Sequence, residues 1–225
     1  MSDFGYKGLR VRSDGGRDPY LISPYQFVRW IGMPPSLGAM GGKECLNDAD
    51  IASIPYGLGE RLVENITLNP PQHSPPSADC TCGIYIARTF KSCVENMGLE
   101  GDILWVVIVT SGKHIESEGL KPNDPRYNIV RVEKARVASI IPPSCMVDNH
   151  MSEYLREESG GWGMQYLCKT CKELYAPGGR GRIFALEDLA KSWGVTVLWD
   201  WWDKVRGLLA RPKSRWDNDE GYIYG

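Results

Sequence analysis

Seven cysteines and three histidines include several at spacings that could bind a metal ion. The Cys80-Thr-Cys82 pair follows His73 across a loop stiffened by adjacent prolines, and a stiff loop loses less chain entropy on binding. Tetrahedral zinc takes four Cys or His ligands, and a structural site keeps all four positions closed. The sequence therefore predicts a first zinc site made of Cys45, His73, Cys80 and Cys82. The alternative is two ordinary buried cysteines beside a surface histidine.

A second set of donors lies in the last third of the chain, at Cys168-Lys-Thr-Cys171. A Cys-x-x-Cys pair is typical of zinc knuckles, and Cys145 and His150 upstream would complete four ligands. A redox dithiol is a rival interpretation, but the βαβ context expected for one is missing. Plain thiols also remain an alternative, as does a single metal site shared by the two regions. Cys93 is expected to be a buried core thiol.

A polar cluster, His114-Ile-Glu116-Ser-Glu118, closely follows the most apolar run of the chain. A histidine with two carboxylates at alternating positions of a strand end could hold a metal or move protons. A metal-dependent enzyme, a nuclease or another hydrolase using His114, Glu116 and Glu118, is therefore one alternative. A solvated hairpin loop is the plainer one. The sequence contains no Gly-x-Ser-x-Gly elbow, Walker loop or His-Glu-x-x-His helix.

Tryptophans are concentrated near the C-terminal end of the sequence. At helical spacing some of them must belong to the core. Because Trp and Arg are enriched in binding hot spots, this end is also a candidate contact surface for a partner. The residues predicted for that surface are Trp199, Trp201, Trp202 and Arg206. Aromatic rings near basic side chains could instead stack on nucleic-acid bases.

The composition is that of an ordinary globular protein, with 42% hydrophobic and 24% charged residues among 225. A net charge of −2 argues against a protein that coats nucleic acid, because such binding needs a basic surplus. No stretch approaches the roughly 18 consecutive apolar residues of a membrane span. The N-terminus lacks a basic-then-apolar signal pattern, so a cytoplasmic location is expected, where disulfides are rare.

Hydrophobic periodicity predicts strands at 6–12 and 20–22, a buried strand at 103–110 and a long strand at 128–141. The last two are expected to pair antiparallel, with a bulge in the long strand where its alternation slips between Val132 and Ala135. Predicted helices cover the residues from Ile84 to the C-cap Gly98, then 151–158, 186–193 and 199–210, with a short strand at 195–198.

These elements predict an α+β fold. A β-rich, antiparallel N-terminal body over residues 1–142, which could be barrel-like, carries the first Cys/His knuckle. A smaller zinc-knuckle and helical region over 143–212 follows the boundary at Pro142-Pro143, and residues 213–225 form a tail that is expected to be mobile.

His73 and the run Cys80-Thr-Cys82-Gly-Ile-Tyr, with Ala87 two residues on, resemble a motif of uncharacterised proteins from actinobacteria and their phages. Those proteins carry a His and then Cys-x-Cys-Gly-Ile-Tyr-Ala, whereas here Ile86 precedes the alanine. The resemblance implies a metal-binding fold of this kind and a phage or actinobacterial origin, and it brings no established activity.

The favoured function is a zinc-stabilised, non-catalytic cytoplasmic accessory protein that binds a macromolecular partner. In this interpretation it is a phage protein that acts on a host protein in the host cytoplasm. The metal-dependent enzyme is the first alternative. The second alternative is a nucleic-acid-binding β-barrel module, which the acidic pI of about 6.0 weakens.

Overall fold

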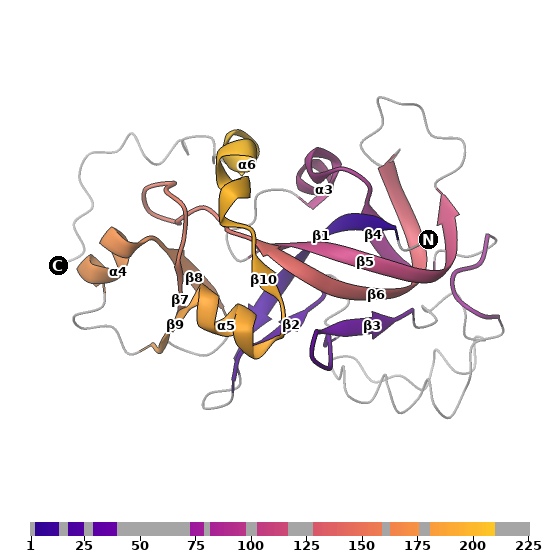
Figure 1. Cartoon of the computed structure of the whole chain (residues 1–225), viewed down its shortest axis with the longest axis horizontal. Helices are drawn as coiled ribbons and strands as arrows, with labels where there is room; N and C mark the ends of the chain where they lie inside the picture. The colour runs from indigo at the N-terminus through magenta and orange to yellow at the C-terminus, as the bar shows by residue number, and fades with distance from the viewer. Residues whose placement is uncertain are drawn as a thin grey trace, which may run out of the picture.

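The computed structural model describes nine segments of the chain: 3–13, 18–24, 29–39, 73–78, 82–97, 103–116, 128–158, 163–175 and 181–209. Three of the predicted site residues, Cys45, Cys80 and Glu118, lie outside these segments, as does the predicted tail 213–225. The described part is a mixed α+β structure, rich in strands, with a seven-stranded sheet and a three-stranded sheet (Figure 1).

The larger sheet is organised around two long antiparallel strands, β5 (Ile103–Glu116) and β6 (Ile129–Ile141). The apolar first half of β5 is buried because β1 (Phe4–Arg12) pairs with its other edge through residues 103–109. The predicted strand at 103–110 and its antiparallel pairing with 128–141 are confirmed. The strand continues to Glu116, where a polar loop was expected, because residues 111–116 keep pairing with β6.

The β5–β6 pairing contains two register shifts, one between Val107 and Ile108 and one between Ser111 and His114. The second lies opposite Glu133, where Gly112 and Lys113 of β5 face a single residue of β6, so the bulge expected in the long strand after Val132 lies in β5 instead. Gly112 permits it because its φ is +82°, and a Cβ there would lie 2.5 Å from the Glu133 carboxylate. That carboxylate accepts the Lys113 amide at 3.0 Å, which fixes the bulge.

Three short strands share the other edge of β6 in turn: β4 (Ile84–Ala87), β3 (Ser36–Gly38) and β10 (Thr196–Val197). The first two are antiparallel to β6 and β10 is parallel. β2 (Tyr20–Ile22) pairs with the far end of β1. Strands β1, β5, β6 and β4 are paired in that order, and β4 pairs with β1 through one residue pair only, Tyr6 with Ala87. With so narrow a closure, the sheet is not a clear barrel.

Two of the predicted helices are wrong: the first begins later than predicted, and the second is a strand. The residues after Cys82 form strand β4, because Ile84 and Ile86 are buried on the sheet, and helix α3 (Phe90–Met97) begins only after Thr89. Thr89 caps it by accepting the Ser92 amide at 3.2 Å. Residues 151–158, predicted as a helix, contain strand β7 (Tyr154–Glu157) instead.

The three-stranded sheet has the order β8–β7–β9, with β8 (Met164–Leu167) and β9 (Ile183–Ala185) on either side of β7. Helix α4 (Lys169–Tyr175) follows β8, and α5 (Leu186–Ser192) follows β9. The predicted boundary at Pro142 coincides with the end of β6. Side chains from both sheets nevertheless share one buried cluster, to which β7 contributes Leu155 and β8 contributes Met164 and Tyr166.

A second buried cluster, which includes Phe90 of α3 and Trp105 of β5, lies between the larger sheet, α3 and the C-terminal helices. The C-terminal helices are the short 3₁₀ helix η3 (Trp199–Trp201) and α6 (Trp202–Leu209). Together they correspond to the predicted helix 199–210. Val205 and Leu209 of α6 are buried here. Among the described residues, the helices are all too short or too polar to cross a membrane.

Candidate metal centre

The first part of the candidate centre is a tight turn that begins at Cys145, shortly after the end of β6 at Ile141. Cys145 donates its amide to the His150 carbonyl at 2.7 Å, and Asn149 donates back to the Cys145 carbonyl at 3.2 Å. Asn149 has φ +59°, a left-handed conformation that asparagine tolerates better than most residues. The turn therefore projects the side chains of Cys145 and Asp148 from one short loop.

The second part is the junction between β8 and α4. Cys168 is the residue before the helix, and its carbonyl accepts the Lys172 amide at 2.9 Å. The Cys171 amide donates to the Cys168 Sγ at 3.4 Å, so the first helical turn holds both thiols on one side. The Met146 amide donates to the Tyr166 carbonyl at 2.9 Å, which ties the turn to β8 beside this junction.

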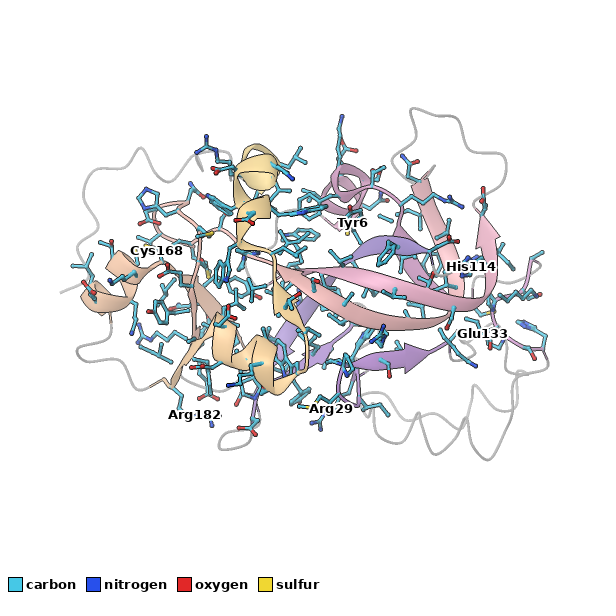
Figure 2. All side chains as sticks on the ribbon, viewed as in Figure 1. Tyr6, Arg29, His114, Glu133, Cys168 and Arg182 are labelled. Atoms are coloured by element: carbon cyan, nitrogen blue, oxygen red, sulfur yellow. The ribbon has the colours of Figure 1, made fainter. Side chains whose placement is uncertain are left out.

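These two parts bring together four side chains that could hold a metal ion. The ligand atoms of Cys145, Asp148, Cys168 and Cys171 all lie within 4.8 Å of one another. The three cysteines are buried, with relative exposures of 0, 5 and 3%, and they form a small cluster with Leu167 against Tyr154. The centre lies at the end of the molecule that carries α4, where Figure 2 labels Cys168.

Without a metal ion, the group consists of one charged carboxylate, that of Asp148, and neutral thiols that donate hydrogen bonds to it. Cys168 and Cys171 donate from Sγ to Asp148 Oδ2, at 3.1 and 3.4 Å. Burial alone would raise the pKa of Asp148, but the hydrogen bonds from Cys168, the His150 amide and the other two thiols outweigh it and hold this pKa well below its usual range. Burial, with Asp148 adding to it, raises the pKa of both Cys168 and Cys171. A bound cation would replace the thiol protons, because thiolates are the metal-binding form.

The structure differs from the sequence prediction at one of the four donors. Cys145, Cys168 and Cys171 were predicted together with His150, whereas the fourth member of the group is Asp148. The His150 ring is exposed, and its Nδ1 lies 3.0 Å from Asp148 Oδ2, on the outer side of the group. A signal for Asp148 was present, since Cys145-x-x-Asp148 repeats the spacing of Cys168-x-x-Cys171.

The first predicted site is only partly within the described residues. His73 and Cys82 are adjacent, with His73 Nδ1 3.9 Å from Cys82 Sγ. The other two predicted ligands, Cys45 and Cys80, lie outside the part of the chain that the structure describes. Cys93 is a buried thiol in α3, as expected.

The alternative catalytic residues have separate partners. His114 Nδ1 lies 3.3 Å from Asp3 Oδ2, while its Nε2 is buried and meets no hydrogen-bond partner among the described residues. Glu116, two residues on, pairs with Arg88 at the end of β4. The two side chains thus belong to different polar contacts, and Glu118 is not described.

The predicted partner-binding residues lie along η3 and α6. The three tryptophans are half-buried: Trp201 and Trp202 pack against the cluster under α3 and α6, and Trp199 packs against the larger core. The Trp199 indole also donates to Glu187 at 2.9 Å. Arg206 is exposed and lies 3.6 Å from Asp203. These rings therefore hold the C-terminal helices to the sheet, and only part of each faces solvent.

No family model matches this chain, and no curated protein or solved structure matches it either. The class of the protein is therefore described from its fold and its candidate site alone. It is a strand-rich α+β protein with a buried group of three cysteines and one aspartate that could hold a metal ion.

Proposed function

We propose that Cys145, Asp148, Cys168 and Cys171 bind a structural zinc ion, and that the protein is a non-catalytic accessory protein that binds a macromolecular partner. The observation that carries the metal assignment is the convergence of three buried sulfurs and one carboxylate oxygen within 4.8 Å. Thiolates favour zinc over hard cations such as Mg²⁺ and Ca²⁺, which prefer oxygen ligands.

A structural role for the ion follows from the number and burial of its donors. Four protein donors fill a tetrahedral zinc, whereas a catalytic zinc keeps one position for water or substrate. Besides the three cysteines, the apolar cluster at the site contains only Leu167 and the partly buried Tyr154 among the described residues. Because so small a cluster contributes little hydrophobic stabilisation, a metal ion there would supply much of the local stability.

Partner binding is supported by exposed apolar side chains and by the charge. Leu208 and Arg206 are both exposed on α6, and Val147 and Leu174 are exposed at the candidate metal centre, with relative exposures of 53 and 70%. Protein interfaces have an apolar centre, and arginine is enriched in them. The net charge of −2 favours a protein over a nucleic acid as the partner.

Metal analysis of the purified full chain tests the zinc assignment. We expect Cys171→Ser to lose one equivalent of zinc and to melt at a lower temperature than the parent, because a buried ligand is removed. Cys93→Ser is the matched control, since Cys93 is equally buried in α3 but belongs to no donor group. Equal zinc content in the two variants would overturn the assignment.

Surface variants of the folded chain test partner binding. Arg206→Glu with Leu208→Asp changes two exposed positions of α6, and Val147→Asp with Leu174→Asp changes the metal region. A partner captured by the parent protein should be retained at least tenfold less by one of these pairs, because interface anchors typically carry 1–2 kcal/mol or more. If both pairs retain the partner as the parent does, these surfaces have no role in binding it.

A further inference from the structure

The loop 73–78 folds back onto the start of β4 and places His73 next to Cys82. Gly83 makes the close approach possible, because its φ is +120° and a Cβ there would lie only 2.9 Å from the Pro76 Cβ. Arg131 of β6 donates to the Cys82 carbonyl at 3.1 Å. Cys82 is thus fixed by the sheet, and the proline-containing loop delivers the histidine to it.

The distance between the two donor atoms suits a shared metal ion. His73 Nδ1 and Cys82 Sγ are 3.9 Å apart. Zinc bonds of about 2.3 Å to sulfur and 2.0–2.1 Å to nitrogen, at a tetrahedral angle, place such a pair about 3.6 Å apart. Cys82 is only 3% exposed and His73 is half-buried, so both donors are already largely desolvated and need little rearrangement.

This pair is distant from the centre at Cys145. Cys82 precedes β4, which pairs with the first residues of β6, while Cys145 follows the last residue of the same strand. A strand of 13 residues spans about 40 Å. In Figure 1 the segment 73–78 and α4 accordingly lie at opposite ends of the molecule.

We propose that His73 and Cys82 are ligands of a second metal site, for zinc or a closely similar borderline-soft divalent cation. One imidazole and one thiolate are a donor combination that zinc accepts and that hard cations do not prefer. This site is independent of the one under the proposed function.

The test is the zinc content of the full chain, measured for the parent and for single variants refolded with excess zinc and then freed of loose metal. The parent should hold two equivalents, and His73→Ala and Cys82→Ser should each hold one. His73→Ala is the decisive variant, because His73 lies on a half-exposed loop and its loss leaves the buried thiol in place. Cys93→Ser, which alters a thiol outside both sites, should keep two.

Cobalt substitution adds a readout that a merely structural effect would not change. The thiolate-to-cobalt charge-transfer band of the parent should lose intensity in Cys82→Ser, whereas His73→Ala should mainly shift the ligand-field bands. The result that overturns the proposal is a zinc content unchanged by His73→Ala. Failure of the other site is distinguishable, because Cys171→Ser would then keep its full zinc content while His73→Ala still lost one equivalent.

Discussion

At the scale of single residues, Asp148 is the member of the candidate metal centre that the sequence analysis did not predict. Its carboxylate accepts hydrogen bonds from Cys168 and Cys171 among others, and both the ring and the amide of His150 contact it from the outside. Under the proposed function, Asp148 would be the ligand and His150 the group that orients it, an arrangement common around metal sites.

This assignment of roles is testable by comparing two substitutions. Asp148→Asn should weaken zinc binding more than His150→Ala, because the first substitution removes a ligand and the second removes only the group that orients it. Loss of such an orienting group lowers the metal affinity by about 10–100-fold, which is the effect expected for His150→Ala. Competition with a chromogenic chelator would measure both affinities. A larger loss for His150→Ala would make His150 the fourth ligand, as the sequence analysis predicted.

Glu157 and Arg182 form a second residue-scale contact, between β7 and the residue before β9. Arg182 donates to Glu157 Oε2 at 3.0 Å and also reaches Ser13 at the end of β1. The hydrogen bond from Arg182 is the main cause that lowers the pKa of Glu157. A carboxylate whose pKa is lower in the folded state stabilises the fold above its unfolded pKa of about 4.3.

We therefore expect Glu157→Gln to lower the urea midpoint at pH 7. The difference from the parent should shrink as the pH falls below about 4 and through the folded pKa, because protonation then removes the same contact from the parent. Urea titrations at a series of pH values measure it. Glu173→Gln, on an exposed position of α4, should show no such pH-dependent difference. A constant difference at every pH would contradict the argument.

At the scale of elements, two glycines differ in their backbone conformation, one just after a helix and one inside a helix. Gly194 follows α5 with φ +65°, and a Cβ there would lie 3.0 Å from Met33 Cγ. Gly207 is inside α6, and a Cβ there would meet nothing within 4 Å. The same substitution should therefore have opposite effects at the two positions.

Gly194→Ala should destabilise the protein by about 1–2 kcal/mol, the cost of a left-handed conformation with a side chain. Gly207→Ala should stabilise it by up to about 1 kcal/mol, because alanine is the better residue inside a helix. Chemical denaturation followed by circular dichroism measures both. Two changes of the same sign would show that backbone conformation is not the deciding factor.

At the scale of the whole molecule, the two sheets form one core. Leu155 of β7 is fully buried in the same cluster as Leu104 and Ile108 of β5, and β10 adds the C-terminal region to the edge of β6. The residues on either side of Pro142 are therefore joined by packing, although the chain turns there.

One core predicts one unfolding transition. Leu155→Ala should cost about 2–5 kcal/mol and lower the midpoints of both the far-UV and the tryptophan fluorescence signals together. Leu174→Ala, at a position with 70% exposure, should change stability by no more than about 0.5 kcal/mol. Separate transitions for the two signals in the Leu155 variant would mean that the sheets unfold independently.

The sequence by itself determined the features that rest on local pattern. A continuous apolar run predicted the strand around Val106, and alternation predicted the strand around Val137. The break in alternation after Val132 predicted the position of a bulge, although the bulge lies in β5 and not in the long strand. The predicted helix 186–193 corresponds to α5 and its C-cap Trp193. Cys-x-x-Cys spacing, with Cys145 upstream, predicted three of the four donors of the candidate metal centre. Each of these signals lies within a few neighbouring residues, so a single sequence is enough to detect it.

Only the tertiary structure decided the features that depend on residues far apart in the chain. Pairing with β6 made Ile84–Ala87 a strand, and pairing with β8 and β9 made Tyr154–Glu157 another, although both read locally as helix. The choice of Asp148 over His150 likewise required the turn at Cys145 to be placed against the start of α4. Helical spacing is a weak preference, and burying a strand between two neighbours outweighs it because the backbone hydrogen bonds and the apolar contacts are gained together.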